Sequence, residues 1–246
     1  MNSLNQFFFG IYPYIALTVF LLGSLARFER EQYTWKTDSS QLLHRGQLRL
    51  GNILFHIGIL GLFFGHLVGL LTPVVVWDTL GVSHTLKQTV AMVAGGVMGG
   101  LCLIGLLILI HRRLSDPRIR KTTRPGDKLL LLWILVTLLL GLSTIALSAG
   151  HMDGEMMVRL MHWAQHIVTF RSGAADFVAE VPPLFKAHLF MGLTLFVIFP
   201  FTRLVHVWSG FASVGYLGRA WPVSYTHLVH VAGEIHLRGR SRRSGQ

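Results

Sequence analysis

Four histidines of this chain lie inside long apolar stretches of sequence. His56 and His66 belong to NILFHIGILGLFFGHLVGLL, and His188 and His206 belong to KAHLFMGLTLFVIFPFTRLVHVW. An ionisable side chain at membrane depth is costly and therefore rare. Two histidines on each of two helices predict two facing pairs of imidazoles. Such a pair supplies both axial ligands of a six-coordinate haem iron, and an iron ligated in this way transfers electrons and does not activate oxygen.

The elements that must position these histidines are membrane helices. Of the 246 residues, 52% are hydrophobic and 13% are charged, whereas about 25% of a soluble domain is charged. A helix needs roughly 20 apolar residues to span a bilayer. We therefore expect an all-α polytopic bundle of five transmembrane helices near 5–27, 50–73, 88–110, 129–149 and 185–208. These helices form one membrane domain over residues 1–209, followed by a basic cytoplasmic tail over 210–246.

The net charge of +11 is interpreted as a topology signal. Five spans put residues 28–49, 111–128 and the C-terminal tail on one side of the membrane. With span ends included, that side holds 18 basic residues, namely Arg27, Arg30, Lys36, Arg45, Arg49, Arg112, Arg113, Arg118, Arg120, Lys121, Arg124, Lys128, Arg203, Arg219, Arg238, Arg240, Arg242 and Arg243. The other side holds 4, namely Lys87, Arg159, Arg171 and Lys186. The positive-inside rule then predicts a periplasmic N-terminus and a cytoplasmic C-terminus, with the lipid bilayer and no nucleic acid as partner.

The directions of the helices decide how the histidines pair. Because the second and fifth spans are antiparallel, His56 must face His206 on the cytoplasmic side, and His66 must face His188 on the outer side. The spacing of His56 and His66 gives a rise of about 15 Å, and that of His188 and His206 about 27 Å. We expect tilt and a kink at Pro200 to absorb this difference, with His188 and His206 on one helix face and the two irons about 20 Å apart.

The type of haem follows from the cysteine content. Cys102 is the one cysteine, and no C-x-x-C-H motif is present, so covalent attachment is excluded and a b-type haem remains. A histidine-based ion transporter is the alternative, but such sites usually add intramembrane carboxylates, and the five expected spans contain none. We expect His162 and His166 to lie on the solvated face of a short interfacial helix.

A proline and two runs of glycine mark the first three spans. Pro13 lies in the first span, where a neighbour must satisfy the carbonyl that it leaves free. The second and third spans carry glycines at helical spacing, namely Gly58, Gly61, Gly65, Gly69, Gly95, Gly96, Gly99 and Gly100. Such glycines indicate close helix packing or room for a flat macrocycle, and the sequence leaves both open.

Several runs of sequence carry a family resemblance. NILFHIGILGLFFGHLVGLLTP, KQTVAMVAGG, LCLIGL, HRRLSDPRIR, SAGHMDGEMM and FPFTRLVHVWS closely resemble the gamma subunit, a di-haem cytochrome b, of bacterial membrane-bound respiratory nitrate reductase. The resemblance covers roughly residues 1–210. It implies a multi-pass protein of the bacterial inner membrane with two haem b groups. It also implies docking to an iron–sulfur beta subunit and to a molybdenum-containing alpha subunit on which nitrate is reduced.

The resemblance further implies that the chain oxidises menaquinol or ubiquinol near the outer haem, with protons leaving outward and electrons passing inward. Roles in anaerobic respiration and nitrate assimilation would follow. The cytochrome b subunit of another respiratory complex, of the hydrogenase or formate dehydrogenase type, is the alternative. Chain order and the five-span count favour the nitrate reductase type.

The family pattern assigns site residues. His66 and His188 are the expected ligands of the outer haem iron, and His56 and His206 those of the inner one. Gly65 lies beside the outer ligand, where it has no side chain to block approach to the haem edge.

Three basic residues complete the expected site. The family's quinol-site lysine falls on Lys87, whose ammonium at the outer start of the third span can donate to a quinol oxygen. From position alone, a lysine that snorkels to the interface is equally plausible. Arg203, one turn before His206, and Arg112 are candidates to pair with haem propionates.

Overall fold

The computed structural model describes residues 3–31 and 45–208, and this part of the chain contains helices and no strand. The long elements are α2 (Tyr12–Glu31), α3 (Arg45–Leu71), α5 (His84–Ser115), α7 (Pro125–Ala149) and α9 (Pro183–Ile198). The short helices are α1 (Ser3–Gln6), α4 (Val74–Thr79), α6 (Pro117–Thr122) and α8 (Glu155–Val168). A π-helical turn, η1 (Phe7–Ile11), joins α1 to α2, and three 3₁₀ turns are η3 (Ala174–Val178), η4 (Phe199–Phe201) and η5 (Arg203–Val205).

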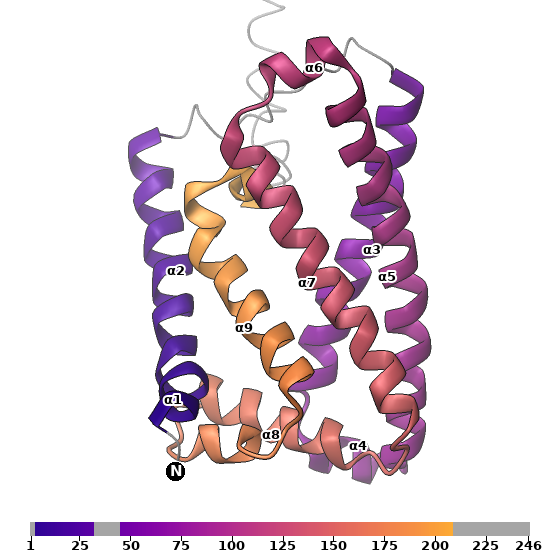
Figure 1. Cartoon of the computed structure of the whole chain (residues 1–246). Coiled ribbons are helices and arrows are strands. Elements are labelled where there is room, and N and C mark those ends of the chain that lie inside the picture. Colours follow the sequence, from indigo (N-terminus) through magenta and orange to yellow (C-terminus); the bar gives the residue numbers. More distant parts are fainter. Residues whose placement is uncertain (1–2, 32–44, 209–246) are drawn as a thin grey trace, which may run out of the picture.

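The predicted five-span helical architecture is confirmed. Five helices are long and apolar enough to cross a membrane, over Ser3–Arg30, Gly46–Leu71, His84–Ser115, Pro125–Ala149 and Pro183–Phe201. In Figure 1 the N-terminus, α4 and α8 lie at one end of the bundle and α6 lies at the other. The charge count places residues 28–49 and 111–128 on one side of the membrane, and the described parts of both segments lie at the α6 end of the bundle. Which end faces the periplasm stays a prediction, and the tail over 210–246 lies outside the described residues.

Glycines hold α3 and α5 in close contact. A Cβ on Gly58 would overlap the backbone nitrogen of Cys102, and one on Gly105 would overlap that of Phe55. The two backbones therefore touch where only glycine fits, in the manner of small-residue membrane packing. Cys102 is fully buried in this contact. By contrast, a Cβ on Gly65 would meet nothing within 4 Å. Close helix packing is therefore confirmed at Gly58 and Gly105, whereas room for a macrocycle at Gly65 stays a prediction.

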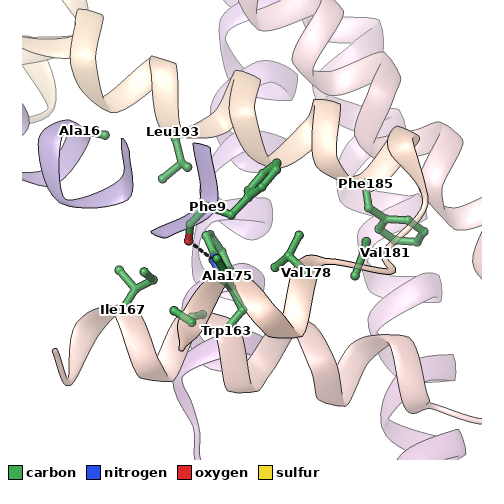
Figure 2. Packing of buried hydrophobic residues seen from close by; sticks show 11 residues of the cluster. Phe9, Ala16, Trp163, Ile167, Ala175, Val178, Val181, Phe185 and Leu193 are labelled. Atoms are coloured by element: carbon green, nitrogen blue, oxygen red, sulfur yellow. Dashed lines mark hydrogen bonds between the residues drawn. The ribbon is translucent and has the colours of Figure 1, made fainter. Parts of the chain in front are cut away.

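A second core lies at the α8 end of the bundle, where Phe9, Trp163, Val178 and Phe185 pack together (Figure 2). Pro13 has no N–H to donate to the Phe9 carbonyl four residues earlier. The indole Nε1 of Trp163 donates to that carbonyl at 2.9 Å. The expectation that a neighbour satisfies the carbonyl freed by Pro13 is thus confirmed, and the same bond ties α8 to the first span.

The fifth span differs from the prediction. The interruption expected at Pro200 is present, but a kinked helix that continues to residue 208 and keeps His188 and His206 on one face by its periodicity is wrong, because α9 ends at Ile198 and the 3₁₀ turns η4 and η5 follow. Pro200 cannot donate to the carbonyl of Phe196, and its ring disfavours continued α-helix. Thr202 is extended, with φ −120° and ψ −179°. The position of His206 is therefore not set by the periodicity of α9, and the rise of 27 Å does not apply.

We expect Gly105→Ala to lower the free energy of unfolding by about 1–3 kcal/mol. Its Cβ would overlap the Phe55 nitrogen of α3 and lie 2.8 Å from the Gly51 oxygen, and backbone cannot rotate away as a side chain can. Thermal unfolding in detergent, followed by circular dichroism, measures the effect. Gly46→Ala is the control, because its Cβ meets nothing within 4 Å. Equal melting of both variants would contradict the backbone contact.

Candidate functional site

The structure brings the four membrane histidines together as two pairs. The ring centroids of His66 and His188 are 6.1 Å apart, and those of His56 and His206 are 6.2 Å apart. The first pair joins the C-terminal part of α3 to the start of α9, near α8, and the second pair lies toward the α6 end. An imidazole nitrogen binds a transition metal at about 2 Å, so two imidazoles on one metal place their centroids about 6 Å apart. Both pairs have this spacing.

The two histidines of α3 are oriented by their own helix. Nδ1 of His56 lies 2.8 Å from the Asn52 carbonyl oxygen, and Nδ1 of His66 lies 2.7 Å from that of Leu62. A carbonyl only accepts, so in the neutral ring Nδ1 carries the proton and Nε2 keeps its lone pair. A metal-ligating histidine almost always donates its second ring N–H in this way.

His188 and His206, which face these two, also have Nδ1 beside a backbone carbonyl. In their case the carbonyl does not belong to the residue four positions earlier. Nδ1 of His188 lies 3.0 Å from the Thr137 oxygen of α7. Nδ1 of His206 lies 2.6 Å from the Arg203 oxygen, three residues earlier. All four imidazoles therefore have Nδ1 directed to a backbone carbonyl, the arrangement in which Nε2 is the ligating nitrogen of a metal-bound histidine.

The α7 helix sets the position of His188 by a close contact as well as by the carbonyl. A Cβ on Gly141 would lie 2.7 Å from Cε1 of His188, so this glycine makes room for the ring. Gly141 and Thr137 are four residues apart and share a helix face. Neither Thr137 nor Gly141 is predicted from the sequence to position a histidine. The available signal was a threonine and a glycine at helical spacing in a span otherwise rich in leucine.

The donor set fits a haem. Within residues 3–31 and 45–208, no group of three or more His, Cys, Asp or Glu side chains gathers, whereas structural zinc sites use four protein ligands and catalytic ones three. Two imidazoles suffice when a macrocycle supplies the other ligands. The open space at Gly65 leaves room for such a group beside His66. We therefore judge that both pairs fit the expected haems.

Lys87 lies in a pocket between α4, α5 and α8 that is also lined by Trp77, His84 and Met157. The lysine is 8% exposed, whereas a snorkelling lysine keeps its ammonium in water. Its Nζ donates to Sδ of Met161 and lies 4.6 Å from the centroid of the Trp77 ring. Neither partner is an oxygen, so the ammonium retains the capacity to donate to a stronger acceptor.

His84 is a second functional candidate in this pocket, and the sequence analysis did not identify it. It lies one turn before Lys87 on α5, and its Nε2 is 3.2 Å from Oδ1 of Asp78. The side chains of His84 and Asp78 are 43% and 55% exposed, so the pair links the pocket wall to solvent. Gly154 has φ +78°, and a Cβ there would lie 2.6 Å from that of His84. Only glycine therefore allows α8 to pack here.

The two expected propionate partners lie at the α6 end. Arg203 donates through Nε to Oδ1 of Asp127 at 2.7 Å and through Nη2 to Oδ2. Arg113 also approaches Asp127, at 3.7 Å. Asp127 lies in the first turn of α7, which begins at Pro125 and so before the predicted residue 129. Arg112 is 5% exposed near the end of α5. Pairing of Arg203 and Arg112 with propionates stays a prediction.

His162 and His166 lie on α8 and are half-buried. Both rings contact Phe177 of η3, with centroid distances of 5.4 and 4.7 Å. The expectation that they lie on a solvated face is thus wrong in part, because η3 folds back over α8 and covers this face.

Comparison with known proteins adds a family to this geometry. The sequence matches the family model described as nitrate reductase gamma subunit over residues 5–230, which extends beyond the limit near residue 210 expected from the resemblance. The gamma chain of respiratory nitrate reductase 1 from Escherichia coli (strain K12) is 49% identical over 221 residues, 90% of this chain and 97% of that protein.

Two further relatives agree. The gamma chain of respiratory nitrate reductase 2 from the same strain is 50% identical over 209 residues, 85% of this chain and 92% of that protein. The nitrate reductase gamma chain of Bacillus subtilis (strain 168) is 39% identical over 219 residues, 89% of this chain and 97% of that protein. Because the two Escherichia coli relatives are named as respiratory enzymes, the expected role in nitrate assimilation is left without support.

We expect Gly141→Ala to disturb the His66–His188 pair alone. Its Cβ would lie 2.7 Å from Cε1 of His188 and would push the ring off its present direction. In the purified protein, electron paramagnetic resonance should show one low-spin haem signal shifted or lost and the other retained. Gly126→Ala on the same helix is the control, since its Cβ meets nothing within 4 Å. Two unchanged signals in Gly141→Ala would refute the role of this contact.

Proposed function

The chain belongs to the nitrate reductase gamma subunit family, and on this premise we propose that it is the quinol-oxidising membrane subunit of a respiratory nitrate reductase complex. The observation that carries the proposal is the pair of bis-imidazole sites, with centroids 6.1 and 6.2 Å apart and each Nδ1 bonded to a backbone carbonyl. Two axial histidines are the ligand set of an electron-transferring haem.

We propose that the chain holds two b-type haems, one at each pair. His66 and His188 would ligate the outer one through Nε2, and His56 and His206 the inner one. When bound, each haem would supply one-electron redox chemistry. The protein's part is to orient the four rings and to leave room beside them, as at Gly65. Arg203 and Arg112 remain the proposed partners of the inner propionates.

Quinol would be oxidised at the Lys87 pocket. Oxidation of a quinol to a quinone releases two protons and two electrons. Lys87 Nζ would donate a hydrogen bond to one quinol oxygen in place of its weak bond to the Met161 sulfur. His84 would take the two hydroxyl protons in turn on Nδ1, because its Nε2 is directed to Asp78, and the two electrons would leave singly to the outer haem site. The half-exposed His84–Asp78 pair then gives each proton a route to the water at this end.

The location and the partners follow from the family and the charge pattern. We propose that residues 1–209 form the membrane domain in the bacterial inner membrane, with the α8 end periplasmic and the α6 end and the tail over 210–246 cytoplasmic. The electrons would leave at the α6 end toward an iron–sulfur beta subunit and a molybdenum-containing alpha subunit that reduces nitrate. Menaquinol or ubiquinol is the proposed donor. The family match favours this complex over a hydrogenase or formate dehydrogenase.

We predict two haems per chain in a pyridine haemochrome assay of the purified complex. His66→Ala or His188→Ala should remove the outer haem alone, and His56→Ala or His206→Ala the inner one, because each pair shares one metal. Redox titration of the haem spectrum distinguishes the two. If the His66 and His206 variants lost the same haem, the pairing would be wrong.

We predict that Lys87→Ala keeps both haems but slows their reduction by quinol. A hydrogen bond from a charged donor contributes about 1.5–3 kcal/mol, which corresponds to roughly a 10- to 150-fold loss in rate at low quinol concentration. Stopped-flow reduction by a menaquinol analogue measures it, while dithionite, which needs no quinol pocket, should reduce the variant fully.

Lys186→Ala is the matched control for the lysine. It removes a lysine from the same end of the bundle, where Lys186 Nζ donates to the Ala179 carbonyl at 2.7 Å and does not line the Lys87 pocket. Its quinol kinetics should equal those of the wild type. Equal kinetics in the Lys87 variant as well would move the quinol site away from this pocket.

A further inference from the structure

The proposed ligand His206 lies beyond the end of α9, which stops at Ile198. The other three membrane histidines belong to α3 or α9, but residues 199–206 run through two 3₁₀ turns joined by an extended Thr202. We call residues 199–206 the Pro200 segment. Because α9 has ended, its periodicity does not set the direction of the His206 ring, and contacts of this segment with neighbouring helices gain importance.

The α2 helix contacts the Pro200 segment through Phe20, whose ring centroid lies 4.9 Å from that of Phe199, and through Gly23 and Arg27. Arg27 Nη1 donates to the Pro200 oxygen at 2.7 Å and to the Thr202 oxygen at 3.0 Å. Gly23 makes room for the proline ring, since a Cβ there would lie 2.7 Å from Cγ of Pro200. Backbone carbonyls freed by a break in a membrane helix need donors, and Arg27 supplies them from a half-buried position.

The α7 helix holds the same segment from another side. Asp127 accepts two hydrogen bonds from Arg203, a bidentate geometry that fixes orientation as well as distance. The carbonyl of Arg203 is the group that Nδ1 of His206 contacts at 2.6 Å. Asp127 is therefore linked to the imidazole through the side chain and the carbonyl of one residue, Arg203. Val205, 1% exposed, anchors the turn between them.

We propose that Arg27 and Asp127 are positioning residues for His206, and that they direct its ring toward His56 and so set the ligand geometry of the inner site. This inference rests on the proposed haem-binding function. Neither residue contacts the His66–His188 pair, whose rings are oriented by Leu62 and Thr137 carbonyls. The effect of losing Arg27 or Asp127 is therefore selective for one of the two sites.

The first test is Arg27→Gln in the full complex. The haem content should fall from two toward about one per chain, or the inner low-spin signal should shift its g-values and midpoint potential, while the outer signal is unchanged. Retention of the outer haem shows that the variant has folded. Arg27→Lys should give an intermediate change, since an ammonium can replace part of the donor geometry. Arg30→Gln, exposed one turn further along α2, is the charge-matched control and should leave both signals as in the wild type.

Two further variants separate positioning from charge. Gly23→Ala pushes on Pro200 without changing any charge and should alter the same haem signal as Arg27→Gln. Asp127→Asn weakens the bidentate bond to Arg203 and should do likewise.

The outcomes distinguish the two proposals. A wild-type complex without two haems overturns the proposed function and this inference with it. Two haems in the wild type, with an unchanged inner signal in Arg27→Gln, Gly23→Ala and Asp127→Asn, overturn the positioning role alone. Equal loss of both haems in these variants also overturns it, because a general effect on the fold is not selective.

Discussion

A neutral imidazole inside a membrane must give its N–H to an acceptor, and this requirement organises the candidate site. In each of the four membrane histidines Nδ1 is bonded to a backbone carbonyl. Leaving such a donor unsatisfied in a bilayer costs several kcal/mol, so the bond is held firmly. The same bond determines which nitrogen remains for a metal and limits the rotation of the ring. Satisfying a polar group at membrane depth and orienting a potential metal ligand are therefore achieved by the same hydrogen bond.

Glycine is used for two opposite purposes along α3. At Gly58 the absence of a side chain lets the backbone of α5 approach to contact, with Cys102 beneath it. At Gly65, two turns later, no neighbouring atom would meet a Cβ. The first arrangement fixes the angle of the helix that carries His56 and His66. The second keeps space next to His66, which a flat cofactor requires.

The Lys87 pocket at one end of the bundle and His206 at the other are positioned by different kinds of contact. At the α8 end, Trp163 ties the first span to α8, and Gly154 brings α8 onto His84, so packing of whole elements shapes the Lys87 pocket. At the α6 end, α9 stops at Ile198, before Pro200 and His206. There Arg27 of α2 donates to backbone carbonyls of the chain after α9, and Asp127 of α7 binds the side chain of Arg203. Arginine suits this role because its planar group offers several donors in fixed directions.

Much of this protein follows from its sequence alone. Apolar length predicts five spans, charge asymmetry groups their ends, and antiparallel direction pairs His66 with His188 and His56 with His206. These inferences succeed because hydrophobic length and helix direction are properties of single segments. The tertiary structure decided what depends on contacts between segments. Examples are the carbonyl of Thr137 that orients His188, the burial of Lys87 against Trp77, and the bond between Asp127 and Arg203. Pro200 shows the boundary clearly. Its presence predicts an interruption, but whether the chain kinks or leaves the helix depends on donors such as Arg27, which lies 173 residues away in sequence.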